Sequence, residues 1–350
     1  MVEIDFLSGS ESDPKSTSSY DAIVARFQEQ QDEEQKVIVI DAGFADIGND
    51  VVNFLADTYS TDKVDLMIST HPDRDHLNGL VTAIQQLNVT ELLIHQPRKY
   101  RSNLTGFTNL DNLDDLLAFA ESQGVVVTDP YTGLSRFNGR LRILGPTEDF
   151  YKNCLEAQFD PEVQAQFAQH PSPLASLLGS LERVASQVLS HLPIETLGND
   201  GKTHPRNDSS VITVLTLDGH RHMLTGDAGI PALVQAADYY EASYGSFAEN
   251  PLCMYQIPHH GSKHNSGKAI LSRILGDHGT PHNPDHHVLI SAAKASKKHP
   301  SPKVTNAVIR RGTKQDNLGV TNGGSLCHHH NATVRRGYGP ITPYPILAED

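Results

Sequence analysis

The segment at residues 70 to 76, THPDRDH, constrains the fold and chemistry of this chain more than any other feature. It follows directly on an apolar run at residues 64–68, which is typical of a buried strand. A solvated turn needs one or two polar residues, whereas this segment carries four potential metal ligands: His71, Asp73, Asp75 and His76. Without a cation, such a cluster repels itself and resists burial. Its mixture of imidazoles and carboxylates predicts a divalent metal site.

The composition describes an ordinary soluble globular protein. The chain has 350 residues, of which 38% are hydrophobic, so it can bury a sizeable core in one domain or two. The 28 basic and 42 acidic residues give a formal charge of −14, which argues against a broad basic surface for nucleic acid. A local basic channel remains compatible with that charge.

The chain shows no targeting signal. Its first residues lack a basic segment followed by an apolar one, so no secretory signal is expected. No apolar run approaches the roughly 18 residues that a membrane-spanning helix needs. The cysteines Cys154, Cys253 and Cys327 are odd in number and far apart, which favours reduced thiols and a cytoplasmic location.

Apolar patterning predicts strands that alternate with helices. The expected strands are residues 2–7, 20–27, 36–44, 64–70, 90–96, 125–129, 141–147, 209–217, 221–227, 252–260 and 287–293. The expected helices are residues 50–59, 77–87 and 113–124. Residues 148–205 lack strand signals and are expected to form a helical insertion. Ordinary packing on the parent domain is the first interpretation, and a lid over the site or a surface for a partner protein are the alternatives. The histidine triplet 328–330 is expected in a polar loop.

Two further strand ends carry potential ligands. One apolar strand ends in Gly226 and Asp227, and another ends in His259, His260 and Gly261. Either alone is weak, because a strand-end aspartate is commonly a turn former and paired histidines are commonly surface residues. A two-metal site needs about six ligands from several segments, so their order after THPDRDH strengthens the metal prediction.

These motifs resemble the metallo-β-lactamase-fold superfamily, and within it the metallo-hydrolase domain of bacterial DNA-uptake competence channels and its stand-alone relatives. The superfamily's His-x-His-x-Asp-His motif stands here as residues 71–76, with Asp73 in place of the second histidine. Further matches are VIVIDAG, NDSSVITVL, MLTGD, PHHGS and the His299-Pro300 pair. The resemblance implies a single α/β domain over residues 1–350, a four-layer αββα sandwich with the helical insertion inside it.

The resemblance also implies the ligands of two divalent ions. His71 and Asp73 would hold one ion, Asp75 and His76 the other, and Asp227 would bridge them. Either His259 or His260 completes the second shell, and the sequence does not separate them; the catalytic set is Asp75, Asp227, His260 and His299. The histidine that many relatives carry before the TGD strand is replaced here by Asn207, and His204 is the nearest alternative.

The predicted ligand charges suit hydrolysis. Three carboxylates and two divalent ions sum to +1, which one hydroxide brings near neutral. Zinc is the first expectation and manganese the second, because carboxylates shift preference towards harder ions. Two ions about 3.5–4 Å apart lower the pKa of a shared water and hold the scissile group.

Phosphodiester hydrolysis, on nucleic acid or a nucleotide-like molecule, is the first hypothesis for the substrate. Basic groups at residues 98–101, 294–299 and 310–311 could contact phosphate, with Lys297 and Lys298 favoured because they adjoin His299. One alternative is hydrolysis of an ester, lactone, thioester or β-lactam, because the fold does not fix the reaction. The other is a metal-stabilised interaction module with weak catalysis, suggested by Asn207. No membrane association is expected, and the sequence does not indicate a protein partner or an oligomeric state.

Overall fold

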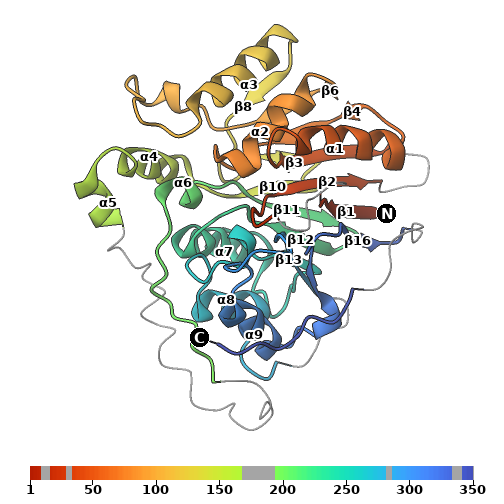
Figure 1. Cartoon of the computed structure of the whole chain (residues 1–350), viewed down its shortest axis with the longest axis vertical. Helices are drawn as coiled ribbons and strands as arrows, with labels where there is room; N and C mark the ends of the chain where they lie inside the picture. Colours follow the sequence, from red (N-terminus) through yellow and green to blue (C-terminus); the bar gives the residue numbers. More distant parts are fainter. Residues whose placement is uncertain (9–15, 29–33, 168–193, 281–285, 333–340, 350) are drawn as a thin grey trace. The chain divides into compact units, whose positions relative to one another are not determined.

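Two seven-stranded sheets make up most of the regular structure in the computed structural model (Figure 1). The structure describes residues 1–8, 16–28, 34–167, 194–280, 286–332 and 341–349. The chain divides into two units, each with one large sheet. Unit 1 comprises Met1–Pro130, Ser291–Lys297 and Thr321–Gly339, and unit 2 comprises Tyr131–Ile290, Lys298–Val320 and Pro340–Asp350.

The sheet of unit 1 has the strand order β16-β1-β2-β3-β5-β7-β8. Its strands are β1 Val2–Phe6, β2 Ala22–Phe27, β3 Lys36–Ala42, β5 Leu66–Ile68, β7 Glu91–Leu93, β8 Val126–Thr128 and β16 Leu326–His330. Pairing is antiparallel from β16 to β3 and parallel from β3 to β8. A short parallel pair, β4 Lys63–Val64 and β6 Asn88–Val89, accompanies it. The parallel half brings the ends of β3, β5 and β7 to one edge of the sheet.

Helices cover one face of this sheet. They are α1 Ile47–Phe54, which continues as a π-helical turn Leu55–Tyr59, α2 Arg74–Ile84 and α3 Leu110–Ser122; a short 3-10 turn, η2 Pro97–Lys99, precedes α3. Their apolar stripes share one core with the sheet residues Val39 and Met67, which are fully buried. Figure 1 shows α1 and α2 side by side over β3.

Gly79 allows α2 to lie unusually close to β3. A Cβ built there would lie 1.8 Å from the carbonyl oxygen of Ala42, and one built at Gly48 of α1 would lie 2.3 Å from the carbonyl oxygen of Gly79. The amide of Gly79 donates to the carbonyl of Gly43 at 2.9 Å. A side chain at Gly79 would therefore push α2 away from the end of β3.

The sheet of unit 2 has the order β15-β14-β13-β12-β11-β10-β9. Its strands are β9 Ser135–Arg136, β10 Leu141–Gly145, β11 Ile212–Leu217, β12 His220–Leu224, β13 Met254–Gln256, β14 His287–Ile290 and β15 Leu318–Val320. Pairing is antiparallel from β9 to β12 and parallel from β12 to β15. The ends of β12, β13 and β14 therefore reach the same edge of this sheet.

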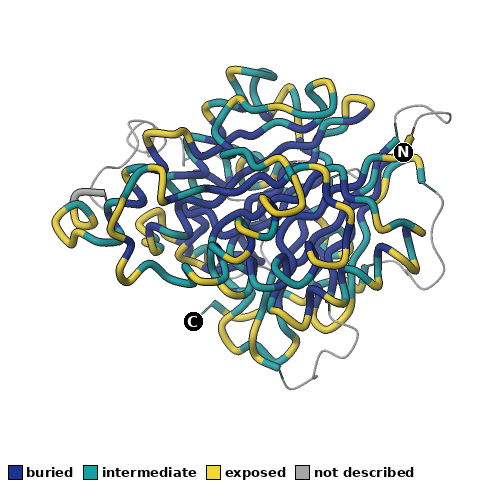
Figure 2. Tube along the Cα trace, turned by 90° about the horizontal axis from the view of Figure 1, so that it is seen from above, coloured by how far each residue is buried: buried dark blue, intermediate teal, exposed yellow. Residues whose placement is uncertain are grey.

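Among the described residues, the α-helices of unit 2 are α4 Glu148–Ala157, α5 Pro161–Phe167, α6 Pro205–Asp208, α7 Ile230–Tyr244, α8 Lys268–Leu275 and α9 Pro302–Arg310. Two 3-10 turns, η5 His259–Gly261 and η6 Gln315–Asn317, complete its described elements. Figure 2 shows long stretches of the chain that are buried along their whole length, with the exposed residues in shorter runs.

The α/β class with two large sheets and flanking helices is confirmed. The predicted start of the second helix at residue 77 is wrong, because α2 begins at Arg74 and Asp73 is its extended N-cap. The polar loop predicted for the histidine triplet is also wrong. His328 pairs with Ile4 in an antiparallel ladder, so the triplet belongs to the edge strand β16.

Other expectations stay open or lie outside the described residues. α4 and α5 begin the predicted insertion, but residues 168–193 lie outside the described part, and the single domain remains a prediction. The three cysteines, all among the described residues, form no disulfide. Within the described ranges, no helix is both long and apolar enough to cross a bilayer.

Candidate metal centre

In unit 1, the link from β5 to α2 carries the four predicted ligands. The loop after β5 holds His71, the N-cap of α2 is Asp73, and the first helical turn holds Asp75 and His76. His71 and His76 are buried, whereas the two aspartates are partly exposed. The structure thus brings all four together at one strand end, half of them on a helix rather than in a loop.

Asp41, at the end of β3, organises this cluster. One of its carboxylate oxygens accepts from the amide of Thr70 at 2.8 Å. The other accepts from the Thr70 hydroxyl at 2.6 Å and lies 2.7 Å from Nδ1 of His76. Asp41 adopts a left-handed backbone conformation, with φ of 53°, and is buried. Such a conformation is uncommon outside glycine, and its occurrence here fits a functional position.

These bonds set which nitrogen each histidine presents. Because a carboxylate only accepts, Nδ1 of His76 carries the proton and its Nε2 faces onward, 4.0 Å from a carboxylate oxygen of Asp75. The Thr70 hydroxyl donates its only proton to Asp41, so it accepts from Nδ1 of His71 at 3.0 Å. Nε2 of His71 then lies 3.8 Å from a carboxylate oxygen of Asp73. Both imidazoles offer the Nε2 lone pair.

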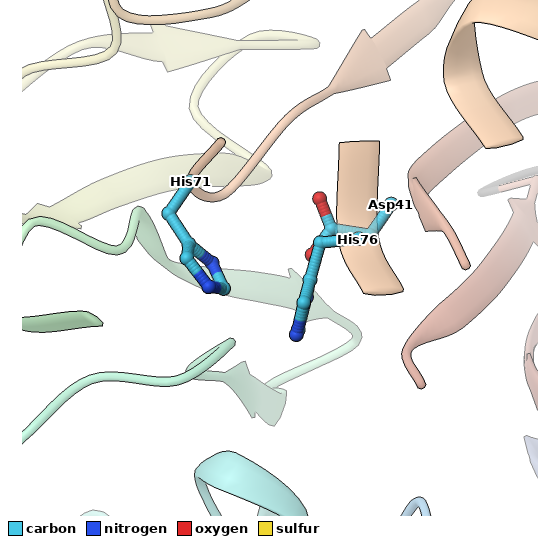
Figure 3. A group of neighbouring side chains, drawn as sticks. All are labelled: Asp41, His71 and His76. Carbon is cyan, nitrogen blue, oxygen red and sulfur yellow. The ribbon is translucent and has the colours of Figure 1, made fainter. Parts of the chain in front are cut away.

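Figure 3 shows the His71 and His76 rings extending in the same direction beside Asp41. Their ring centroids are 4.2 Å apart, and one ligand atom from each of these three residues lies within 4.8 Å of the others. The three could therefore hold an ion. We assign Asp41 to orientation instead, because both of its oxygens already accept hydrogen bonds; carboxylates commonly support metal-binding histidines in this way.

Asp41 was not among the residues that the sequence selected. The available signal was its position, an aspartate closing an apolar strand in VIVIDAG. Nothing in the sequence indicated that β3 neighbours β5, and that pairing is what brings Asp41 to Thr70 and His76.

In unit 2, Asp227 follows β12, and η5 follows β13. His259, His260 and Gly261 are three successive left-handed residues, with φ of 49°, 56° and 83°. The amide of His259 donates to the carbonyl of Gly226 at 3.1 Å, which ties this turn to the segment that carries Asp227. A run of left-handed residues that includes two histidines is costly, on the order of 1 kcal/mol or more for each non-glycine, and again fits a functional position.

Gly261 brings His299, the third predicted site histidine of unit 2, to this turn. A Cβ at Gly261 would lie 2.5 Å from Cβ of Pro300, and its carbonyl accepts from the amide of Ser301 at 3.0 Å. As a result, the ring of His299 stacks on that of His259 at 5.7 Å and lies 6.3 Å from that of His260.

Burial, together with the neighbouring His260 and His259, lowers the pKa of His299 to about 4. The His299 imidazole is consequently neutral near pH 7. It can exchange hydrogen bonds with a substrate oxygen, but it does not supply positive charge.

Nδ1 of His259 faces two side-chain amides, whereas Nδ1 of His76 in unit 1 faces a carboxylate. Its Nε2 lies 3.6 Å from a carboxylate oxygen of Asp227. Its Nδ1 lies 2.9 Å from Oδ1 of Asn265 and 3.1 Å from Nδ2 of Asn207. Nδ2 of Asn207 is also 3.4 Å from the Asp227 carboxylate. Asn207 therefore lies in the polar shell of Asp227 and His259, while His204 is exposed and caps α6 through its Nδ1.

The four predicted site residues of unit 2 thus share one neighbourhood: Asp227, His259, His260 and His299. Asn265 is a further residue of this group that the sequence did not indicate. It lies six residues beyond His259 and contacts that ring only because of the turn at η5.

Four of the eight lysines and arginines in the predicted basic segments serve structural ion pairs. Arg98 forms a two-pronged pair with Asp114, with contacts of 2.8 and 2.6 Å, and Lys99 pairs with Asp129 at 2.7 Å. Further along the chain, the buried Arg310 pairs with Glu349, and the buried Arg311 pairs with Glu195. Of the favoured lysines, both Lys297 and Lys298 are exposed.

Comparisons with known proteins give distant structural similarity only. No protein-family model and no curated protein matches the chain. A solved structure described as a candidate metallo-β-lactamase from Thermotoga maritima is 10% identical, with a TM-score of 0.35, covering 70% of this chain and 86% of that one. A solved diphosphatase of the PhnP family is 12% identical, with a TM-score of 0.39, covering 94% and 98%.

Proposed function

We propose that the chain is a metal-dependent phosphodiesterase that uses two divalent ions, zinc first and manganese second, on nucleic acid or a nucleotide-like substrate. The proposed ligands come from both units, and the proposal rests on the motifs and on the geometry inside each unit. They are His71, Asp73, Asp75 and His76 from unit 1, and Asp227 with His259 or His260 from unit 2.

The observation that carries the proposal is the hydrogen-bond network of Asp41. It accepts from Nδ1 of His76, which holds the ring proton on that nitrogen, and through Thr70 it orients His71 in the same way. Both Nε2 atoms then lie within 4.0 Å of an aspartate carboxylate. Two buried imidazoles beside carboxylates fit zinc or a harder divalent ion, and a network that only stabilised a turn would not need both Nε2 atoms presented together.

Divalent ions bound here would lower the pKa of a water molecule and offset the charge of a scissile phosphate. The protein's own part is to hold the ligands and to position the substrate. Asp41 and Thr70 prevent His71 and His76 from rotating. His299, neutral at physiological pH, exchanges hydrogen bonds with a phosphate or leaving-group oxygen, and exposed Lys298 beside it supplies the positive charge that His299 lacks.

The test combines metal content with turnover. Untagged protein is reconstituted with zinc or with manganese, analysed for metal by elemental analysis, and assayed on bis-p-nitrophenyl phosphate. Asp75→Ala and Asp227→Ala remove one proposed ligand from each unit. Asp111→Ala, which removes an exposed carboxylate from α3, is the matched control.

We expect two ions per chain and turnover that both ligand variants lose and the control keeps. Turnover of a carboxylic ester or lactone without phosphodiester turnover would replace this reaction with acyl hydrolysis at the same site. One ion or none, with no turnover in either metal, would contradict the enzyme and leave an interaction module.

A further inference from the structure

We infer that Asn265 is a positioning residue that fixes the tautomer of His259, so that Nε2 is the nitrogen that His259 offers to a metal. The inference deepens the proposed function and rests on it for the role of the metal. The tautomer itself depends only on contacts inside unit 2.

The orientation of the Asn265 amide is fixed by acceptors on one side. Asn265 lies just before α8 and is fully buried, at 0% exposure. Its Nδ2 donates to the carbonyl of Asp227 at 2.8 Å. Two further acceptors, the Thr203 hydroxyl at 3.3 Å and the carbonyl of Ala228 at 3.5 Å, face the same nitrogen. A flipped amide would place its oxygen against these oxygens, so Oδ1 of Asn265 must be the atom that faces His259.

That oxygen determines which ring nitrogen carries the proton. Oδ1 of Asn265 lies 2.9 Å from Nδ1 of His259 and can only accept a hydrogen bond. Nδ1 therefore carries a proton, and in a neutral ring the lone pair is on Nε2, 3.6 Å from the Asp227 carboxylate.

Asn207 supports the opposite tautomer, because its Nδ2 lies 3.1 Å from the same Nδ1 and would need a lone pair there. The two contacts cannot both be hydrogen bonds. If Asn207 prevailed, the buried Oδ1 of Asn265 would face a lone pair and lose its partner, at a cost of about 1–3 kcal/mol. If Asn265 prevails, Asn207 still donates to Asp227 at 3.4 Å. The second arrangement leaves fewer groups unsatisfied, so it is the one we assign.

The arrangement parallels that of unit 1 with a neutral group in place of a carboxylate. Asn265 accepts from His259 as Asp41 accepts from His76, but it adds no charge beside Asp227. Asn265 also links two proposed ligands, since its amide donates to the backbone carbonyl of Asp227 and accepts from the ring of His259. A change at Asn265 should consequently disturb the ring orientation and the metal affinity together.

The experiment records two-bond ¹H–¹⁵N correlations of the histidine rings in metal-free, ¹⁵N-labelled protein, with His259 assigned from its loss in His259→Gln. We expect a protonated Nδ1 and an unprotonated Nε2 in the wild type. Asn265→Ala should shift His259 towards the Nε2-protonated form. Asn265→Asp loses the donor to the Asp227 carbonyl but keeps an acceptor facing Nδ1, so it should retain the wild-type tautomer. Asn207→Ala is the matched control, with no change of tautomer expected.

Zinc affinity, measured by chelator competition, should fall roughly 10–100-fold in Asn265→Ala. An Nε2-protonated ring in the wild type, or a change caused by Asn207→Ala and not by Asn265→Ala, would overturn the inference. Because the spectra need no metal, failure of the proposed enzyme appears separately, as a correct tautomer in a protein that binds no ion. Should Asn265→Ala not fold, the wild type and Asn265→Asp still decide the result.

Discussion

The two units support their histidines with different chemistry. In unit 1, the Asp41 carboxylate accepts from His76 and, through Thr70, orients His71. In unit 2, the amides of Asn265 and Asn207 surround His259. A carboxylate increases the basicity of the imidazole it holds, whereas an amide mainly fixes its orientation.

The difference has a consequence for charge. Unit 1 places Asp73 and Asp75 beside its histidines, and the buried Asp41 and Asp21 add two further carboxylates, at 2.7 and 3.9 Å from Nδ1 of His76. Unit 2 places one aspartate, Asp227, beside its histidines and adds only neutral amides. The unit 1 cluster therefore depends more on a bound cation to offset its carboxylates, and the unit 2 cluster depends more on its turn geometry.

The largest expected effect comes from Gly79, where α2 approaches β3. Gly79→Ala should lower the free energy of unfolding by about 3 kcal/mol or more, because its Cβ would overlap the rigid carbonyl of Ala42. Urea denaturation followed by circular dichroism measures the loss. Gly324→Ala is the control, since the nearest atom to a Cβ there is 3.8 Å away. Equal stabilities would show that the helix is not held by this contact.

The next effect concerns Asp208, the buried last residue of α6. Asp208 accepts a backbone hydrogen bond from Gly229, yet burial outweighs that bond and raises the pKa of Asp208 to about 8. The native state keeps this proton from about pH 4 to 8, whereas the unfolded state has lost it. Rising pH therefore costs stability, at most about 1.4 kcal/mol per pH unit from this group.

Asp208→Asn should remove that dependence, so the stability gain of the variant grows between pH 5 and pH 8. Urea midpoints at several pH values test this, with the exposed Asp111→Asn as the control. Parallel profiles for variant and wild type would contradict the prediction and mean that Asp208 is ionised in the folded protein.

Asp41→Asn tests the support of unit 1 directly. Asparagine tolerates the left-handed backbone at this position and can accept from the amide of Thr70, but it carries no charge. We expect zinc affinity to fall about 10–100-fold by chelator competition. Asn207→Ala should cost less, since in the assigned arrangement Asn207 donates to Asp227 and does not hold a histidine ring. Equal losses would show that the bond from His76 to Asp41 matters no more for zinc than this neutral donor.

The smallest effect concerns the exposed lysine beside His299. Lys298→Ala should raise KM for a polyanionic substrate, leave kcat nearly unchanged, and reduce the salt dependence of binding by up to about one charge. Arg98→Ala, which removes a cation already paired with Asp114, should leave KM unchanged and alter stability by less than about 1 kcal/mol. An Arg98 effect equal to that of Lys298 would indicate long-range attraction rather than a local contact.

Much of this protein could be predicted from local patterning. Apolar runs marked the strands, and the strand-end clusters His71–His76, Asp227 and His259–His260 were found because metal ligands at strand ends are dense and chemically unlike turn residues. The β16 strand was missed because a histidine triplet has no period-two apolar signal, and only pairing with β1 makes it a strand.

The sequence by itself predicted which residues could bind metal, because side-chain type and order along the chain are local information. Only the tertiary structure decided how those side chains are held. Asp41 reaches Thr70 because β3 pairs with β5, and Asn265 reaches His259 because a left-handed turn folds residues 259–265 back on Asp227. The supporting residues need only a carbonyl or carboxyl oxygen in the right place, and many residue types offer one, so no spacing rule in the sequence could identify them.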